Sequence, residues 1–333
     1  MKTVTGRSFA RAGLLGNPSD GYHGKAISII VRNYSAVATV SSSNKLEFLG
    51  TDESLTFGSL AETQADDYQI SGAGLLLAAA RQFETYGKQN GLDTLQPVRI
   101  EFQSDIPQQV GIAGSSAIVI ATLRALCSFH EYSIPKSALA SLALAAEKSL
   151  GIEAGLQDRV IQAYEGAVAM NFEQAAMQSV NGVPVGTYAA LDPNLITNLF
   201  VSFSASLSES TNVLHGSLRE RYESGDQKVI DALQEIASLV EPGRKAIEDG
   251  NLAELSRLVD RNFDLRESIC DLNPGHVKMV ETARECGASA KYCGSGGAII
   301  GVYPDENTYQ RLTERMASIG CTTFKPEITS PSN

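Results

Sequence analysis

Tryptophan is missing from this chain of 333 residues, and cysteine and histidine are scarce, with five and four residues respectively. The odd number of cysteines, their scattered positions and the lack of any Cys-x-x-Cys pair argue against a disulfide framework or a zinc site. We therefore expect reduced thiols in a cytoplasmic protein. The histidines lie too far apart for a metal motif, and we expect His130 and His276 at the surface or at helix caps.

Long apolar runs and an excess of positive charge are also lacking. No segment approaches the length that spans a membrane, and the N-terminus lacks the apolar core of a signal peptide. The chain carries 27 Lys and Arg against 38 Asp and Glu, a formal net charge of −11. This balance argues against nucleic acid or an anionic membrane as a partner, but a locally basic pocket is compatible with a small anionic substrate. We expect a monomer or a homodimer.

Apolar residues are plentiful, at 43%, which is enough for the core of one large or two ordinary domains. Predicted strands and helices follow one another in mixed order rather than in strict alternation, which favours an α+β protein. The polar, patternless residues 173–186 are a candidate boundary between domains of residues 1–180 and 181–333. The predicted strands are 26–31, 35–40, 98–103, 167–172, 199–203 and 298–303. The predicted helices are 66–86, 116–130, 137–150, 156–164, 212–223, 228–248, 252–269, 277–286 and 307–319.

The most informative segment is the glycine-containing loop from Pro107 to Ala117, which follows a predicted strand and leads into an apolar helix. Gly111 and Gly114 allow a tight turn and a close approach of backbone N–H groups to a ligand. The start of the helix adds unpaired donors and a partial positive charge. Together these features predict an anion site, most simply for phosphate. The loop matches neither the P-loop nor the dinucleotide signature, and a plain helix cap explains it equally well.

A second polar segment lies near the N-terminus. Arg11 precedes a glycine turn by five residues, and the turn is followed by the short polar side chains of Asn17, Ser19 and Asp20. Such side chains can pair with the hydroxyl groups of a sugar. A strand end followed by an Asx-type turn is the alternative.

Two carboxylates in the middle of the chain are candidates for chemistry. Glu147 lies on an otherwise apolar helix face, where a carboxylate is costly unless it is paired, and a divalent cation is a suitable partner. The adjacent hydroxyls of Ser115 and Ser116 suit phosphate oxygens or a hard metal ion. Asp158 lies in the first turn of a predicted helix, where it stays a carboxylate ready to accept a proton. Taken singly, a solvent-facing Glu147 and an Asp158 paired with Arg159 or a later cation explain these residues as well.

A third segment, Lys291–Ala298, contains glycine at positions 294, 296 and 297 and leads into a predicted strand. Glycines in this position allow another backbone or a ligand to approach closely. A tight bend between a helix and a strand is the alternative.

These segments together resemble the three motifs of the GHMP kinases, in the order of that family and across almost the whole chain. Pro107-x-x-x-Gly111-x-x-Gly114-Ser115-Ser116-Ala117 is similar to the phosphate loop of the family. Within the superfamily, the chain is similar to glucuronokinases of the plant type. That likeness lies in residues 10–20, 111–118, 146–152, 154–159 and 287–298. The resemblance implies the α+β, two-domain GHMP kinase fold, with an N-terminal ribosomal S5-like domain, a C-terminal ferredoxin-like domain and the active site in the cleft between them.

The resemblance also implies an activity, the phosphorylation of the anomeric hydroxyl of a free sugar with ATP and Mg²⁺, and D-glucuronate as the sugar. Galacturonate, a heptose or fucose are alternative substrates. A mevalonate-type kinase is less compatible, because Asn17-Pro18-Ser19-Asp20 replaces the Gly-Glu-His of mevalonate kinase. A non-catalytic sensor of sugar or nucleotide is the alternative from another class of protein.

Each candidate residue receives a role from the resemblance. Asp158 would orient or deprotonate the anomeric hydroxyl. Arg11, which cannot shuttle a proton, would hold Asp158 as a carboxylate and stabilise the transferred phosphoryl group. Ser115 or Ser116 would hold Mg²⁺ together with Glu147. The residues implied to bind ATP are Pro107, Gly111, Ile112, Ala113, Gly114, Ser115, Ser116 and Ala117. Those implied to contact the substrate are Asn17, Ser19, Asp20, Gly294, Ser295 and Gly296, with Arg7 and Arg159 as candidates for a substrate carboxylate.

Overall fold

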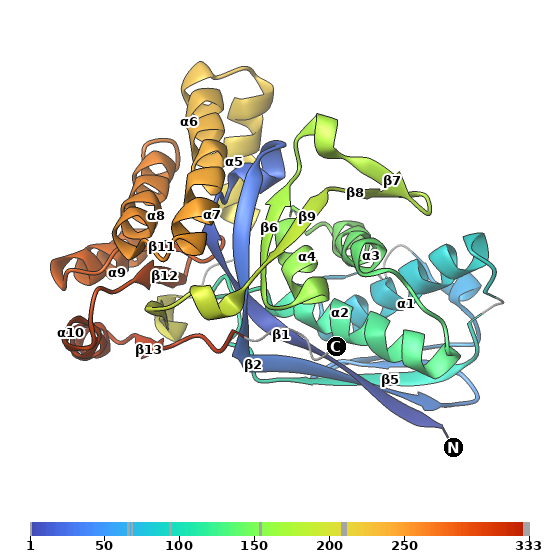
Figure 1. Cartoon of the computed structure of the whole chain (residues 1–333). Helices are drawn as coiled ribbons and strands as arrows, with labels where there is room; N and C mark the ends of the chain where they lie inside the picture. The colour runs from blue at the N-terminus through green and yellow to red at the C-terminus, as the bar shows by residue number, and fades with distance from the viewer. Residues whose placement is uncertain are drawn as a thin grey trace.

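The computed structural model describes residues 2–64, 67, 69–92, 95–152, 155–207 and 212–328, and of residues 207 and 212–217 only the backbone. Two larger sheets and a short hairpin alternate irregularly with helices along the chain. This mixed order confirms the predicted α+β class. Figure 1 shows the first sheet with α1–α4 on one side of the molecule and the C-terminal helices α6–α10 on the other.

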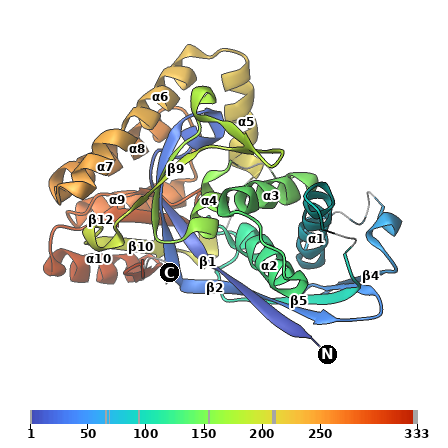
Figure 2. The ribbon, with the colours of Figure 1, turned by 45° about the vertical axis from the view of Figure 1, so that its right-hand side comes forward.

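The first sheet has seven strands in the order β4-β3-β5-β2-β6-β9, with β1 paired to β2. β3 and β5 run parallel, and the other neighbours run antiparallel. Its strands are β1 (Thr3–Leu15), β2 (Lys25–Ser42), β3 (Leu46–Leu49), β4 (Ser54–Phe57), β5 (Val98–Ser104), β6 (Ala167–Asn171) and β9 (Thr187–Leu191). One face is covered by α1 (Gly72–Gln89), α2 (Gly114–His130), α3 (Lys136–Ser149) and α4 (Gln157–Tyr164), as Figure 2 shows.

α2 lies directly on β1. Gly6 of β1 makes this close packing feasible, because a Cβ atom at that position would overlap the carbonyl oxygen of Ala121. The helix is apolar and buried along almost its whole length, as the sequence predicts, so its first turn is held firmly against the sheet.

The pairing of β1 with β2 is interrupted twice, after Phe9 and after Gly13. After Phe9 the partner residues change from Ser35 to Val31, so the additional residues 32–34 lie in β2 and β1 itself is continuous there. Arg7 and Arg11 are four residues apart and would share one face of a regular strand. Arg7 is exposed, whereas Arg11 is buried and donates to the carbonyl oxygens of Gly111 and Cys293.

The second sheet has four antiparallel strands in the order β11-β12-β10-β13. Its strands are β10 (Leu199–Phe203), β11 (Lys291–Tyr292), β12 (Ala298–Val302) and β13 (Thr322–Phe324). The helices of this half are α5 (Asn212–Glu223), α6 (Gln227–Ser238), α7 (Val240–Glu248), α8 (Leu252–Glu267), α9 (Pro274–Glu285) and α10 (Glu306–Ser318). Phe200, Phe263 and Tyr292 lie in the core between the sheet and α8–α10. α7 packs on the first sheet instead, where Gly243 leaves room for Leu15, so the two halves are joined by one apolar core.

Several predicted elements differ from those observed. The helix expected over 228–248 is two helices, α6 and α7, which meet at Leu239. Pro242 lies in the first turn of α7, where its missing N–H is tolerated. The polar stretch 173–186 forms a hairpin of β7 (Gln178–Val180) and β8 (Val183–Val185) rather than a patternless linker. His276 is completely buried in α9, so the expectation of a surface or cap position was wrong.

The helix expected from residue 66 begins at Gly72, because the side chain of Ser71 caps it by accepting a hydrogen bond from the N–H of Gly74. Residues 65, 66 and 68 lie outside the described part of the chain. Within that described part, none of the helices combines the length and the apolar character that a membrane span requires.

The expected division between residues 180 and 181 stays a prediction. β9 follows this position in the chain but pairs with β6 in the first sheet. The chain therefore passes from the first sheet to the second only after residue 181, between Leu191 at the end of β9 and Leu199 at the start of β10.

Candidate active site

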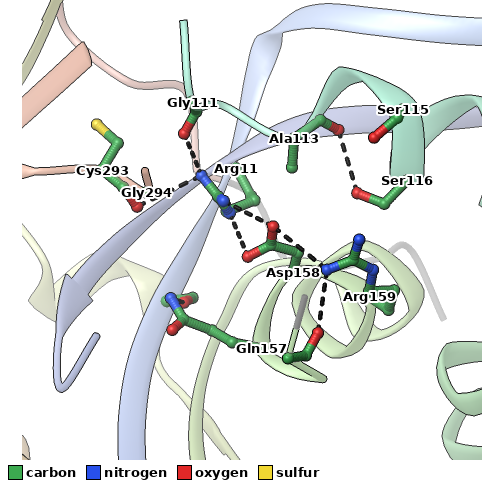
Figure 3. Close-up of polar contacts among 12 residues, drawn as sticks. Arg11, Gly111, Ala113, Ser115, Ser116, Gln157, Asp158, Arg159, Cys293 and Gly294 are labelled. Carbon is green, nitrogen blue, oxygen red and sulfur yellow. Dashed lines mark hydrogen bonds and ion pairs between the residues drawn. The ribbon is translucent and has the colours of Figure 1, made fainter. Parts of the chain in front are cut away.

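Arg11 and Asp158 form the centre of the candidate site, as Figure 3 shows. Arg11 comes from β1 and Asp158 from the first turn of α4. The guanidinium donates from Nε to Oδ1 and from Nη2 to Oδ2 of the carboxylate, at 2.7 Å in both cases. Such a two-point pair is among the stronger and more directional interactions in proteins. Burial alone would lower the pKa of Arg11, but the charge and hydrogen bonds of Asp158, together with contributions from other neighbouring groups, raise the pKa above its ordinary value.

The third nitrogen of Arg11 ties this pair to the two glycine-containing segments. Nη1 donates to the carbonyl oxygen of Gly111 at 2.5 Å and to that of Cys293 at 3.3 Å. The backbone of Arg11 also donates to Ile112 at 3.1 Å. One side chain thus connects the loop that contains Gly111, the segment after β11 and the carboxylate of Asp158.

Glycines let these two segments lie against each other. Gly111 has φ of +73°, and a Cβ atom there would overlap the carbonyl oxygen of Gly296. A Cβ at Gly294 would lie 2.5 Å from the carbonyl oxygen of Gly111 and 2.7 Å from Nη2 of Arg11. The alternative of a simple bend before a strand does not explain this contact, because the glycines are needed by the facing loop.

The first turn of α2 follows this loop directly, beginning at Gly114. Ala113, at the N-cap position, adopts a left-handed conformation with φ of 65°. No side chain caps the helix at this end in the part of the chain that the structure describes. The first backbone N–H groups therefore have no side-chain partner, which is the arrangement expected of an anion site. Gln162 fixes the turn from behind by donating to the carbonyl oxygen of Ala113 at 2.8 Å.

Glu147 is completely buried rather than solvent-facing. Ser115 Oγ donates to Oε1 of Glu147 at 2.7 Å, and Arg159 Nε donates to Oε2 at 2.6 Å. Arg159 also places Nη1 3.5 Å from Oδ2 of Asp158. The two carboxylates that the sequence singled out are therefore linked through one buried arginine.

Ser115 and Glu147 fit a magnesium ion better than Ser116 does. Neighbouring ligands on an octahedral ion with bonds of 2.0–2.1 Å lie about 2.9 Å apart. The two oxygen atoms of Ser115 and Glu147 are already close to that separation. The Oγ of Ser116 is turned toward the carbonyl oxygen of Ala113, at 3.3 Å. No group of three or more His, Cys, Asp or Glu side chains suits a metal among the described residues. Magnesium does not need such a group when substrate phosphates complete its shell.

The polar segment after β1 reaches the same region. Asp20 follows a cis Asn17–Pro18 bond and lies in the short helix η1 (Ser19–Tyr22). Its carboxylate lies where a Cβ atom of Gly155 would be, at the start of α4. Burial, together with the charge of Asp158, raises the pKa of Asp20 to about 7. Ser19 Oγ is instead used locally, and donates to the carbonyl oxygen of Lys25 at 3.1 Å.

Two arginines predicted as candidates for a substrate carboxylate, Arg7 and Arg159, already have partners within the protein. Arg7 is exposed on β1 and donates to Ser35 Oγ at 3.1 Å. Arg159 is at the site but is occupied by Glu147 and by the carbonyl oxygen of Gly155. The expectation that either arginine binds a substrate carboxylate is therefore not supported by their positions.

Several residues near the site escaped the sequence reasoning. Arg266 donates to the carbonyl oxygens of Gly294 and Ser295, at 2.7 and 3.0 Å, and so shapes the third segment. Asn262, one turn earlier on α8, contacts the segment after β1. Both lie at helical spacing within the buried face of α8, and polar residues on an apolar stripe are the signal that would have revealed them.

A cavity of about 570 Å³ lies beside η1 and is distinct from this centre. It is lined by residues of η1, α5 and α6, among them Tyr22, Tyr222 and Leu233, and neither Arg11 nor Asp158 reaches it.

Comparison with protein families identifies both halves of the chain. Residues 74–166 match the GHMP kinases N terminal domain, and residues 244–320 match the GHMP kinases C terminal domain. The chain belongs to the GHMP kinases. This kinase is 38% identical to "Probable glucuronokinase 2" and 34% identical to "Glucuronokinase 1", both from Arabidopsis thaliana. The alignments cover 92% and 98% of this chain, and 86% and 92% of those proteins.

Solved structures show the same fold at lower identity. A Lin0012 protein from Listeria innocua is 16% identical, with a TM-score of 0.83 over 98% of each chain. The galactokinase of Lactococcus lactis, complexed with galactose, is 14% identical, with a TM-score of 0.77 over 100% of this chain and 95% of that one. The two-domain GHMP kinase fold and an ATP-dependent sugar kinase activity, both expected from the sequence, are thereby confirmed.

Proposed function

We propose that this GHMP kinase transfers the γ-phosphoryl group of ATP to the anomeric hydroxyl of D-glucuronate and releases glucuronate 1-phosphate and ADP. Two glucuronokinases align with nearly the whole chain, which supports this sugar. The observation that carries the proposal is the Arg11–Asp158 pair, a fixed carboxylate beside an uncapped helix N-terminus. A proton acceptor next to an anion site is the arrangement that hydroxyl phosphorylation requires.

In this mechanism Asp158 accepts a hydrogen bond from the anomeric hydroxyl and takes its proton as the hydroxyl oxygen bonds to the γ-phosphorus. The bond between the γ-phosphorus and the bridging oxygen of ADP breaks in the same displacement. Arg11 keeps Asp158 ionised and oriented, and its fixed charge stabilises the negative charge on the transferred group. The backbone of Gly111–Ser116 and the first turn of α2 bind the phosphates.

Ser115 and Glu147 are the residues that would hold Mg²⁺. When bound, the ion would neutralise charge on the β- and γ-phosphates. Arg159 orients Glu147 in the buried site by donating to its Oε2 atom.

Asn17 and Asp20 are the residues that we assign to the sugar hydroxyls, because their segment adjoins Asp158 through Gly155. Gly294–Gly296 would form the floor of the pocket, next to Gly111. We also propose the cytoplasm as the compartment, because all five cysteines are free thiols. A monomer or homodimer stays a prediction.

The test is ADP release measured with a panel of free sugars. The panel contains D-glucuronate, galacturonate, fucose, a heptose and galactose, with mevalonate as the non-sugar acceptor. We expect the highest kcat/KM with D-glucuronate, and a phosphate on C1 by ³¹P NMR of the product. A higher kcat/KM with another sugar would reassign the substrate. Binding of sugar and nucleotide without any turnover would favour a sensor instead.

A further inference from the structure

Lys291 is a buried lysine for which the phosphoryl transfer described above has no use. It lies in β11, at the start of the third glycine-containing segment, and its relative exposure is 1%. Lysine is seldom buried so completely, because the ammonium group loses its hydration. An apolar side chain of similar length would fill this space at lower cost, so a charged residue here points to a purpose other than packing.

The Nζ atom of Lys291 donates to three acceptors. It donates to the carbonyl oxygens of Gly13 and Tyr292, at 2.7 and 2.8 Å, and to Oδ1 of Asn17. An ammonium group has three N–H donors, so every one of them is used. Two of the acceptors belong to β1 and to the segment that follows it, although Lys291 belongs to the C-terminal half.

A second residue of the C-terminal half holds the backbone at the same point. Asn262 of α8 donates from Nδ2 to the carbonyl oxygen of Asn17 at 3.0 Å and accepts from the N–H of Gly16 at 2.8 Å. The side chain of Asn17 is thus held by Lys291 of β11, and its backbone is held by Asn262 of α8. Asp20 and η1 follow Asn17 directly, so the position of the whole segment depends on these contacts.

We propose that Lys291 is a positioning residue which, by holding Asn17, fixes the sugar-binding segment 17–20 relative to Asp158. The inference deepens the proposed function, and its kinetic part rests on that function. The distance between the hydroxyl-binding groups and the proton acceptor is then set by the C-terminal half. A displacement of about 1 Å at a reacting centre lowers rates by about 100-fold, so such a contact acts on the sugar without touching it.

The charge of Lys291 supplies a readout that a packing role does not have. Burial lowers the pKa of Lys291 to about 7. Burial also raises the pKa of the neighbouring Cys293 thiol to about 12, so this thiol is neutral near pH 7. The charged groups that face Lys291 are Arg266 from α8, Arg11 from β1 and Asp20 from η1. Above pH 7 the neutral amine has two N–H donors for three acceptors, and Asn17 is held less firmly.

The first experiment does not depend on activity. Hydrogen exchange is compared between wild type, Lys291→Met and, as a matched control, Lys278→Met, which removes a half-exposed lysine on α9. We expect at least tenfold faster exchange in residues 16–22 of Lys291→Met, with unchanged exchange in α2 and α4 and no effect of Lys278→Met. Unchanged exchange in residues 16–22 would overturn the proposal, whether or not the protein turns over any sugar.

The second experiment uses the sugar that wild type phosphorylates best. We expect Lys291→Met to raise the KM for this sugar by at least tenfold, with the KM for ATP within twofold of wild type. The fall of sugar kcat/KM above pH 7 should disappear in Lys291→Met. In Asn17→Asp, the fall of sugar kcat/KM should begin a pH unit or more higher, because the added carboxylate favours the charged form of Lys291.

Two outcomes of the kinetics contradict the proposal. One is an equal rise of both KM values in Lys291→Met, and the other is an alkaline limb that this substitution leaves unchanged. If Lys291→Met does not fold, the position of the alkaline limb in Asn17→Asp decides alone, since this variant keeps an acceptor for Lys291 and adds a negative charge beside it. Its KM for the sugar is not used, because we assign Asn17 to the sugar hydroxyls. A wild type that phosphorylates no sugar would refute the proposed function, and the exchange experiment would still decide on Lys291.

Discussion

Arg159 donates from Nε to Oε2 of Glu147 at 2.6 Å, in an ion pair whose side chains are 3% and 0% exposed. A carboxylate so deeply buried is stable as an anion only with a partner of this kind. The pair keeps the charge of Glu147 in place beside Ser115, where a divalent cation would need it.

Glu147→Gln removes that charge and leaves Arg159 buried without its partner. Breaking one half of a buried ion pair typically costs about 3–5 kcal/mol, so we expect a marked loss of stability in urea or thermal unfolding. We also expect a higher Mg²⁺ concentration for half-maximal activity. Glu281→Gln is the control, because Glu281 is exposed and its ion pair with Lys278 is long, at 3.5 Å. Equal stability of both variants would contradict the role of this ion pair.

Asp158→Asn keeps the shape of the side chain but cannot take a proton. We expect kcat to fall by about 10²–10⁴-fold, the usual contribution of a general base. Binding of a nucleotide analogue, measured by calorimetry, should stay within a few fold of wild type. Retention of more than a tenth of the wild-type kcat would show that Asp158 is not the proton acceptor.

Arg11→Lys preserves the charge but not the two-point geometry. A single ammonium cannot reach both oxygens of Asp158 and the carbonyl oxygen of Gly111 at once. We expect kcat to fall by about 100-fold through misplacement of Asp158. Arg7→Lys is the matched control on the same strand and should leave kcat unchanged, because Arg7 is exposed. A large effect of the control would reopen Arg7 as a substrate residue.

Asp20 should make sugar binding depend on pH. Its pKa is raised to about 7, mainly by burial, so it is neutral below pH 7 and ionised above it. If the carboxylate accepts hydrogen bonds from sugar hydroxyls, sugar kcat/KM falls as the pH drops through 7, and this limb is absent in Asp20→Asn.

Stability gives an independent check on Asp20. A carboxyl group whose pKa is higher in the folded than in the unfolded state destabilises the fold once it ionises in the unfolded chain. The stability advantage of Asp20→Asn over wild type should therefore grow from pH 4 to pH 7 and stay constant above that. An advantage that does not change with pH would contradict the raised pKa.

Gly111→Ala tests the contact between the two glycine-containing loops. The new methyl group would overlap the carbonyl oxygen of Gly296, so one loop must move. We expect the KM for ATP to rise by at least tenfold. Gly91→Ala is the matched control, because Gly91 has φ of +90° and a Cβ atom there would meet no atom of the described residues within 4 Å. It should cost about 1–2 kcal/mol of stability without changing the KM for ATP.

The sequence predicted the α+β class, most helices and the residues that meet at the site, because each depends on local pattern or on a short motif. Arg11, Gly111 and Asp158 are far apart in the chain, and their meeting was expected only through the family resemblance. The irregularity after Phe9, where residues 32–34 of β2 have no partners in β1, has no local signal, since it arises from the pairing of β1 with β2.

Buried polar contacts were the other part that sequence reasoning could not supply. The sequence pattern predicts Glu147 as a metal ligand or a surface residue, and Arg159 as a partner of Asp158 or of the substrate. Their ion pair forms because α3 and α4 pack side by side, which is a tertiary effect. The pairing of β9 with the first sheet is also a tertiary effect. The sequence of one strand does not specify which sheet it joins, because that depends on the strands beside it.

The contact between Gly111 and Gly296 also limits the space beside the loop that contains Gly111. The backbone of Gly296 fills the volume that a side chain at Gly111 would need. If this loop binds the triphosphate, as we propose, the phosphates lie on its other side, near Ser115 in the first turn of α2. A segment from the opposite end of the chain then determines on which side of the loop the nucleotide binds.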